Sequence, residues 1–339
     1  MPTSSSTLVE SLPEASSVSE AKAALLKPTS APVFARPVLE DAQWAIPLLA
    51  ASKRMGCDYA FGNIYAWNPL YKSEITQYQG FFLSRSISEK EHGLKPEYCF
   101  PIGDGDLRVP IEAMRRDAAE LGYPLRMYGL TEADKDRLEA IYPGEFEYHT
   151  DRDSSDYIYT RRDLANLTGK KYHHKRTHLT AFFRENQWEY SELLSRDASL
   201  EGILDLAKEW EQENQDNENK DPERLEMERV AIKRFFKNME AFGGKGAVLK
   251  SGGNVVAFCG GEELYPGVFC THFEKASSKV RGAYQAINNL FAVNSLEGYE
   301  YINREEDVGD EGLRQAKLSY RPVILLDKWV ATEIRSTAL

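Results

Sequence analysis

Residues 246–296 read GAVLKSGGNVVAFCGGEELYPGVFCTHFEKASSKVRGAYQAINNLFAVNSL, and this stretch decides the fold. Its apolar pattern predicts three strands, at Gly246–Lys250, Asn254–Glu262 and Val268–Glu274. Ser251-Gly252-Gly253 is a tight-turn signal that joins the first two. A helix is predicted after them, over Val280–Leu296. Antiparallel strands followed by a helix indicate a mixed α/β sheet.

The rest of the second half adds elements before and after this stretch. We expect, in chain order, a strand, two helices, a strand, a helix and a strand: Trp188–Leu193, Leu200–Asn214, Pro222–Phe242, Tyr299–Asn303, Glu311–Leu318 and Val323–Trp329. In the first half we expect strands at Val33–Pro37, Ile75–Ser84, Tyr98–Ile102, Leu125–Tyr128 and Glu145–His149. Its expected helices are Leu39–Ala51, Asp106–Leu121 and Thr131–Ile141.

Both halves therefore have the same element order, without visible sequence similarity. It is the order of the GCN5-related N-acetyltransferase (GNAT) fold, in which a central strand and the following helix splay apart and admit an acyl carrier. We expect an α/β fold of two tandem GNAT-like domains, residues 33–155 and 185–339, with the active site in the second. A basic connecting segment, residues 156–184, is predicted to hold a short strand and one or two helices. Residues 1–32 are rich in Ser and Pro and are expected to be a disordered tail.

Composition narrows the class of protein. The chain has 339 residues and a net charge of -11, and no apolar run approaches the length of a membrane span. Its four cysteines show no CxxC pairing, which favours a reduced, cytoplasmic compartment. The net acidity disfavours a general nucleic-acid coat. Residues 161–184, however, carry seven Lys or Arg and a single Asp, so a polyanionic ligand has a local basic patch to bind.

The strand that ends near Glu274 offers candidate acid–base chemistry. Strict alternation places His272 and Glu274 on one face, where they fit a base and its orienting partner. The alternative is a satisfied polar pair at a strand end. Arg281, Gly282 and Tyr284 then open a helix, whose N-terminus suits a phosphate, although a plain helix start has the same appearance.

Residues 301–322 gather many polar side chains at the end of the next strand. Arg314 and Lys317 share a helix face and fit a phosphate or an oxyanion. Other candidate substrate contacts near this region are Lys275, Asn303, Arg304, Glu305 and Asp307. A solvated loop followed by a salt-bridged helix is the alternative.

The segment 169–178 contains basic residues interleaved with Tyr. Lys171, Lys175 and Arg176 suit a phosphate backbone, or else belong to a basic surface helix packed on the acidic helices that follow. His174 and His178 have the spacing of a metal pair but lack a third ligand, so we expect no metal. GxSxG, Walker A, GxGxxG and paired CxxC motifs do not occur, which disfavours the enzyme and zinc classes that use them.

Several of these motifs resemble those of one family. They are Arg152-Asp153-Ser154-Ser155-Asp156-Tyr157-Ile158-Tyr159, the segment from Leu167 to Arg176, His272-Phe273-Glu274-Lys275-Ala276, Ile302-Asn303-Arg304-Glu305-Glu306-Asp307, and the segment from Gly312 to Pro322. Over about residues 33–335 the chain resembles the phosphatidylglycerol lysyltransferase C-terminal domain family. The resemblance implies a tandem GNAT-like fold, also shared by Fem-type aminoacyltransferases. It further implies transfer of an aminoacyl group from aminoacyl-tRNA to a lipid hydroxyl, and a Gly-Leu-Arg-x-x-Lys segment that lines the site, here Gly312 to Lys317.

The leading hypothesis is an aminoacyl-tRNA-dependent acyltransferase without a bound cofactor. His272 or Glu274 would act as the base, Lys317 and Arg314 would stabilise the oxyanion or bind phosphates, and Tyr320 would protonate the leaving oxygen. The expected partners are a tRNA acceptor end, a lipid or small-molecule acceptor, and, at most, the surface of a membrane. An acyl-CoA-dependent acetyltransferase is one alternative. A non-catalytic binding module, in which His272, Glu274 and Lys317 pair internally, is the other.

Overall fold

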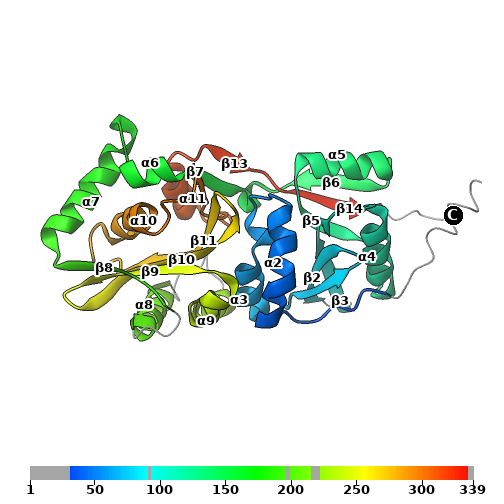
Figure 1. Cartoon of the computed structure of the whole chain (residues 1–339), viewed down its shortest axis with the longest axis horizontal. Helices are drawn as coiled ribbons and strands as arrows, with labels where there is room; N and C mark the ends of the chain where they lie inside the picture. The colour runs from blue at the N-terminus through cyan, green and yellow to red at the C-terminus, as the bar shows by residue number, and fades with distance from the viewer. Residues whose placement is uncertain (1–30, 91–92, 195–198, 215–221, 335–339) are drawn as a thin grey trace, which may run out of the picture.

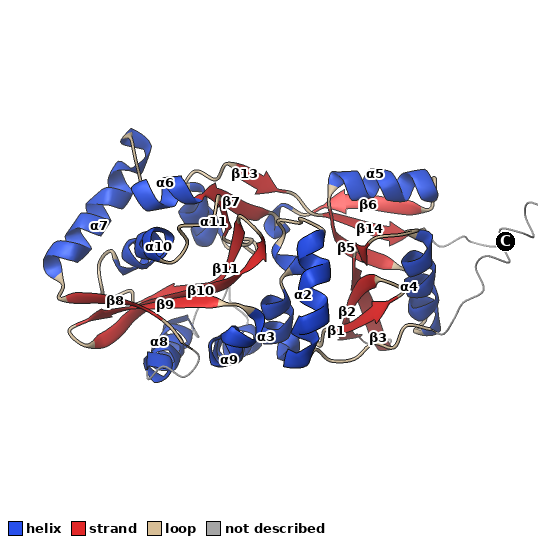
Figure 2. Ribbon diagram, in the orientation of Figure 1, coloured by secondary structure: helices blue, strands red, loops and turns tan. Residues whose placement is uncertain are grey.

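A computed structural model describes residues 31–90, 93–194, 199–214 and 222–334 (Figure 1). The N-terminal tail expected to be disordered falls almost entirely outside these residues. The molecule is elongated, with one mixed β-sheet near each end of its long axis and helices around and between them (Figure 2). The expected mixed α/β class is confirmed. No helix within the described ranges combines the length and the apolar character needed to cross a membrane.

The first sheet belongs mainly to the N-terminal half. Its strand order is β1-β2-β3-β5-β14-β6, with β4 paired to β2. The bounds are β1 Glu74–Tyr78, β2 Phe81–Lys90, β3 Gly93–Cys99, β4 Ile102–Gly103, β5 Arg126–Leu130, β6 Phe146–Thr150 and β14 Trp329–Glu333. All pairs are antiparallel except β3 with β5. The expected strand at Val33–Pro37 is instead extended chain with a single bridge, between Ala35 and Ile75.

The helices of this half are α2 Ala42–Ala51, α3 Phe61–Tyr71, α4 Arg108–Glu120 and α5 Glu132–Ile141. The Thr131 side chain caps α5 by accepting from the Asp134 backbone N–H, as the sequence predicts. Five short 3₁₀ helices are also described: η1 Leu39–Asp41, η2 Cys57–Tyr59, η3 Arg152–Ser154, η4 Lys170–Tyr172 and η5 Met239–Phe242.

The second sheet has the order β13-β7-β12-β11-β10-β9-β8. Its strands are β7 Asp156–Thr160, β8 Trp188–Glu192, β9 Lys245–Ser251, β10 Asn254–Tyr265, β11 Val268–Ala276, β12 Tyr301–Asn303 and β13 Ile324–Leu326. Only β11 and β12 are parallel. The helices are α6 Arg161–Asn166, α7 His173–Glu185, α8 Ser199–Asn214, α9 Pro222–Asn238, α10 Ala283–Asn294 and α11 Glu311–Leu318. In Figure 1, α10 and α7 lie on one face of this sheet, and α8 and α9 on the other.

Each half places one strand in the sheet of the other half. In the second sheet, β7 lies between β12 and β13, although it directly follows the N-terminal half in sequence. In the first sheet, β14 occupies the equivalent place between β5 and β6. The expected domain bounds therefore differ from the structure at two strands. β7, expected in a connecting segment, is a strand of the second sheet, and β14, expected in the C-terminal domain, is a strand of the first.

A shared apolar core joins the two halves. From the N-terminal half, α3 packs against α9 below the second sheet, and its Phe61 and Tyr65 contact Phe242 of η5, which follows α9. Trp67 stacks on Phe273 of β11, with ring centroids 6.1 Å apart. The two halves therefore bury part of their hydrophobic surface against each other.

Candidate active site

The candidate site lies where the parallel strands β11 and β12 separate. Their pairing runs from Val268–Tyr301 to Cys270–Asn303 and then stops. Beyond that point the two strands are no longer paired. This is at their carboxyl ends, where α/β proteins commonly bind ligands. The side chains that follow are His272 and Glu274 from β11 and Arg304 and Glu305 after β12.

A β-bulge changes which side chains face this gap. Gly260 pairs with Phe273 and Gly261 with Thr271, so His272 is an extra residue on β11. The bulge puts His272 and Phe273 on the same face, where both rings contact Phe235 of α9. The expectation that His272 and Glu274 share a face is therefore wrong, because it assumed unbroken alternation.

Glu274 lies on the α10 side and anchors a charged cluster. Its carboxylate accepts from Asn288 Nδ2 at 2.9 Å and from Arg304 Nη2 at 2.7 Å. The Arg304 guanidinium also lies 5.5 Å from the Tyr159 ring centroid and 4.8 Å from that of Tyr320. Its other terminal nitrogen, Nη1, is buried and has no hydrogen-bond partner among the described residues. A buried guanidinium donor without a partner is costly, so an oxygen atom of a ligand would bind there favourably.

Lys175 of α7 reaches the same cluster from above the Tyr320 ring. Its Nζ lies 4.0 Å from the ring centroid, and the side chain is half-buried. Burial, followed by the positive charge of Arg304, lowers the pKa of Lys175 to about 8. Burial raises the pKa of Tyr320, so its hydroxyl stays protonated. Lys175, expected at the tRNA surface, instead contributes an amine of reduced basicity to the gap.

His272 is unsuited to the role of base expected for it. Its ring nitrogens contact two carboxylates, Nδ1 with Glu305 at 2.7 Å and Nε2 with Glu262 at 3.0 Å. Burial alone would lower the pKa of His272, but Cys270 and the bonds to Glu262 and Glu305 raise it well above its usual value. A charged imidazole with both nitrogens occupied does not accept a proton from a substrate.

Lys317 holds the loop after β12 in place instead of facing a substrate. Its buried ammonium donates to the backbone carbonyls of Arg304, Glu305 and Glu306. Glu305 has a positive φ of 57°, a conformation that this capping stabilises. Asn303 supports the same turn by accepting from the Glu305 N–H at 2.7 Å. Lys317 and Asn303 are therefore positioning residues, not the expected oxyanion donor and substrate contact.

Arg314 is also engaged within the protein. It binds Asp307 through Nε and Nη2, at 2.9 and 2.7 Å, and Asp153 at 2.6 Å. Burial of Asp307 opposes its charge, but bonds from Arg314 and the Tyr157 hydroxyl lower its pKa to about 2. In place of the expected phosphate or oxyanion role of Arg314 and the expected substrate contact of Asp307, the two form an ion pair in which Asp307 is fully buried and Arg314 is 23% exposed.

The remaining predicted residues lie outside the gap. Lys275 binds Glu228 at 2.8 Å and covers the Trp210 ring, and Lys171 is exposed and binds Asp163 at 3.5 Å. Tyr284 is partly exposed at the start of α10, and Arg281 is exposed just before it. Gly282 has a φ of 83°, and a Cβ there would lie 2.3 Å from the His178 carbonyl oxygen. Arg176 donates to the carbonyls of Leu167 and Gly169.

Sequence reasoning missed a buried cluster at the junction of the halves. The Lys328 ammonium binds Asp156 at 3.0 Å, Glu306 at 2.9 Å and Asp58 at 3.1 Å. Burial, followed by the charge of Asp156, raises the pKa of Glu306 to about 7 despite Lys328. Cys57 Sγ adjoins Asp156 and Glu306, and the possible ligand atoms of these three lie within 4.8 Å of one another, as do those of Cys270, His272 and Glu305. In the first group the Lys328 ammonium already binds both carboxylates.

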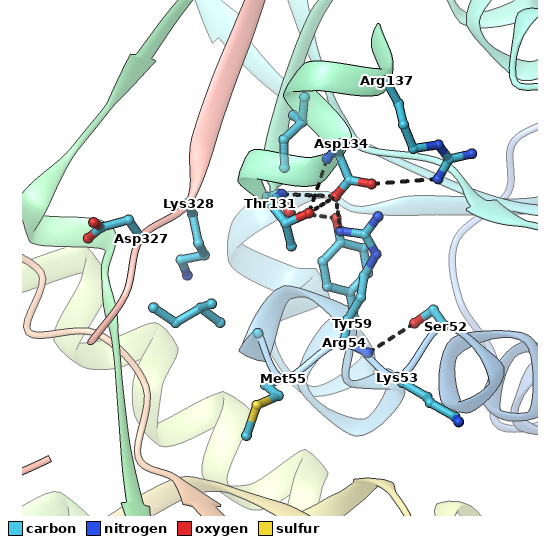
Figure 3. Close-up of a pocket in the computed structure, with 14 residues that line it drawn as sticks. Ser52, Lys53, Arg54, Met55, Tyr59, Thr131, Asp134, Arg137, Asp327 and Lys328 are labelled. Atoms are coloured by element: carbon cyan, nitrogen blue, oxygen red, sulfur yellow. Dashed lines mark hydrogen bonds and ion pairs between the residues drawn. The ribbon is translucent and has the colours of Figure 1, made fainter. Parts of the chain in front are cut away.

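A hollow of about 320 Å³ lies beside this cluster, in the N-terminal half (Figure 3). Lys328 faces it from one side, and Arg54 and Asp134 lie on the other. Arg54 binds Asp134 at 2.5 Å and covers the Tyr59 ring, so this pair is satisfied internally. The hollow adjoins the end of β5, the place in the first sheet that corresponds to the end of β12.

Comparisons with known proteins agree with this architecture. Residues 49–332 match the family model described as phosphatidylglycerol lysyltransferase, C-terminal. No curated protein matches the sequence. A crystal structure of a conserved protein of unknown function from Bacteroides thetaiotaomicron is 35% identical, with a TM-score of 0.81, over 89% of this chain and 99% of that one.

Two more distant structures show the same fold. L-PGS from Bacillus licheniformis is 15% identical, with a TM-score of 0.63, over 90% of this chain and 95% of that one. FemX is 9% identical, with a TM-score of 0.55, over 89% of this chain and 97% of that one. The family model covers most of the chain, and the Bacteroides relative shares more than a third of its residues. The chain therefore belongs to the phosphatidylglycerol lysyltransferase C-terminal domain family.

Proposed function

We propose that this protein transfers an aminoacyl group from aminoacyl-tRNA to a hydroxyl or amine of a lipid or small molecule. Membership of a lysyltransferase family supports an acyl- or aminoacyltransferase of the GNAT-like type. The observation that carries the proposal is the unpaired, buried Nη1 of Arg304 in the gap between β11 and β12. A guanidinium held by Glu274, with one terminal nitrogen that has no partner, is suited to the oxygen of an ester carbonyl as negative charge develops on it.

The reaction consists of one acyl transfer and the proton transfers that accompany it. The acceptor oxygen or nitrogen forms a bond to the carbonyl carbon, and the bond from that carbon to the ribose oxygen breaks. Lys175, with a pKa of about 8, takes the proton of the attacking group. Tyr320 donates its proton to the ribose oxygen, and the ammonium of Lys175, above its ring, returns a proton to the phenolate.

A non-catalytic binding module is the second candidate, because one observation favours it. His272, Glu274 and Lys317 all have partners within the protein, as that alternative predicts. The acyl-CoA alternative has no such support. Its expected pyrophosphate site includes Gly282, whose Cα faces the backbone of α7 at close range.

The test uses the full chain and a mixed pool of radiolabelled aminoacyl-tRNAs, with and without a cell extract as the source of acceptors. We expect extract-dependent loss of label from tRNA. Arg304→Lys should reduce it by about a hundredfold, since Lys does not reproduce the fork that binds both Glu274 and the substrate oxygen. Lys237→Gln, which changes an exposed residue of α9 on the other face of the second sheet, should leave it unchanged.

Two results would contradict the proposal. One is the absence of label loss with every aminoacyl-tRNA while the protein remains folded by circular dichroism, which supports the binding module. The other is equal activity of the wild type and Arg304→Lys, which removes Arg304 from the chemistry. Stabilisation of the protein by CoA esters in a thermal-shift assay would instead favour an acyl-CoA donor.

A further inference from the structure

A basic hollow of about 390 Å³ lies where α7 passes the start of α10, outside the site described above. Six of its residues come from α7 at helical spacing and one precedes α10: His173, Arg176, Thr177, Thr180, Ala181, Arg184 and Arg281. The spacing of three and four places the six in one continuous stripe along the helix. In Figure 1, α7 runs along the outer margin of the second sheet, so the stripe lies on an outer part of the molecule.

The positive charge of this hollow is only partly compensated. Arg184 and Arg281 both approach the single carboxylate of Glu185, at 2.6 and 3.9 Å. Arg176 donates only to neutral backbone carbonyls. Three guanidinium groups therefore have one carboxylate partner within the described part of the chain. Arg184 and Arg281 have side chains that are 71% and 57% exposed, so both are free to bind a ligand from solution.

The remaining lining favours phosphate oxygens. Thr180 is exposed and presents a hydroxyl donor between the arginines, whereas the exposed Thr177 hydroxyl already donates to the His173 carbonyl at 3.0 Å. Guanidinium forks and hydroxyls are the usual side-chain partners of phosphodiester oxygens. A stripe with repeated donors fits successive phosphates along a strand better than it fits one isolated anion.

We propose that this hollow docks the phosphodiester backbone of an RNA stem. A membrane surface fits less well, because the large apolar side chains of α7, Leu179, Phe182 and Phe183, pack inward. A helix that lies on a membrane presents such residues outward. That the RNA is the tRNA part of the donor rests on the proposed function.

The position of Lys175 supports this link. It lies on α7 next to Arg176, yet its Nζ covers the Tyr320 ring in the gap between β11 and β12. One face of α7 therefore lines the basic hollow, and an adjoining face reaches the candidate site. An RNA stem docked on the stripe would therefore lie against the same helix that carries Lys175.

The test measures binding of a fluorescent RNA hairpin with a single-stranded 3′ end, over a range of salt concentrations. We expect log Kd to rise linearly with log salt. The double variant Arg184→Gln and Arg281→Gln should bind about tenfold more weakly, with a salt slope smaller by about one to two. The matched control is Lys233→Gln with Lys237→Gln, which removes the same charge from exposed positions on α9, on the other face of the sheet.

The outcomes separate this proposal from the proposed function. Equal weakening by both double variants, or hairpin binding that neither changes, would overturn the assignment of the hollow. Binding of phosphatidylglycerol vesicles without binding of RNA would also overturn it, in favour of a membrane surface. If the hairpin binds as expected but no aminoacyl group is transferred, the docking hollow stands and the donor reaction fails. If transfer occurs and the KM for tRNA is the same in the double variant of Arg184 and Arg281 as in the wild type, the proposed function stands and the docking hollow fails.

Discussion

At the scale of single residues, burial decides what each charged side chain does. Arg314 and Lys317 look alike in sequence, as two positive charges three residues apart on one helix face, and the structure commits both to internal partners. Arg304 and Lys175 differ from these two residues. Arg304 has a guanidinium nitrogen, Nη1, without a hydrogen-bond partner, and the pKa of the Lys175 ammonium is lowered to about 8. Sequence motifs identify such residues as polar and clustered, but they do not show which bonds are already made.

The reduced pKa of Lys175 predicts a pH dependence of the reaction. If its neutral amine is the base, kcat/KM should rise with pH and level off above about pH 8, because the amine is increasingly deprotonated there. Steady-state rates across pH 6 to 10 would measure this rising part of the pH profile. Lys175→Gln should remove it, and a rise that persists in that variant would assign the base to another group.

Asp307 predicts a loss of stability in acid. Its pKa of about 2 is below that of the unfolded chain, so its contribution is present above about pH 4 and lost as the pH falls toward 2. Asp307→Asn should cost about 3 kcal/mol at neutral pH, because Arg314 is left without its main partner, and should show a weaker loss between pH 4 and 2. Urea unfolding at a series of pH values measures both effects.

The control for Asp307 is Asp153→Asn, the exposed partner of the same guanidinium. It should cost less than about 1 kcal/mol, because solvent screens an exposed pair. Equal costs for the two variants would show that the burial of Asp307 does not strengthen the pair.

At the scale of elements, periodicity predicted most helices and strands but not their irregularities. The strands of residues 246–276, the helix after them and the cap at Thr131 follow from patterns that are local in sequence. The helix α3 was not predicted, because it is buried between α2 and α9 and lacks one clear apolar face. The bulge at His272 was not predicted either. It depends on Gly261 of the neighbouring strand β10, where a Cβ would lie 1.8 Å from the Cys270 carbonyl oxygen.

The contact between α7 and α10 gives a prediction for Gly282. Gly282→Ala places a side chain at positive φ and against the His178 carbonyl oxygen, so it should destabilise the protein by about 2 kcal/mol or more. It should also weaken binding of the RNA hairpin, because the hollow lies at this contact. Gly298→Ala, with open space around its Cα, is the control and should change thermal stability by less than about 1 kcal/mol. An unchanged melting temperature for Gly282→Ala would show that α7 moves away freely.

At the scale of the whole molecule, the pairing of strands could not be predicted from the order of elements. The sequence indicates two halves with the same order of elements. A strand with the same place in that order, such as β7 or β14, fits either sheet. The structure places β7 in the second sheet and β14 in the first. The Lys328 cluster lies at this exchange, where residues from η2, β7 and the loop after β12 meet. Its members are scattered along the sequence, so no local motif could assemble them.

The exchange predicts the effect of a truncation. A chain that ends at Lys328 loses β14, which leaves the backbone groups of β5 and β6 without partners and exposes the fully buried site of Ala331. Hydrogen exchange of β5 and β6 should become fast, while β9 and β10 in the second sheet stay protected. A chain that ends at Ile334 keeps β14 and serves as the control. Protection of β5 and β6 in the shorter chain would show that another segment fills the gap.

The exchanged strands also set an order of events during synthesis on the ribosome. The first sheet is nearly complete when β6 leaves the ribosome, but its missing strand is not made until almost all of the second half has been translated. During that interval β7, the equivalent strand, is the next strand to emerge. A nascent chain can therefore close its first sheet with β7, and it must release that strand before the second sheet can form.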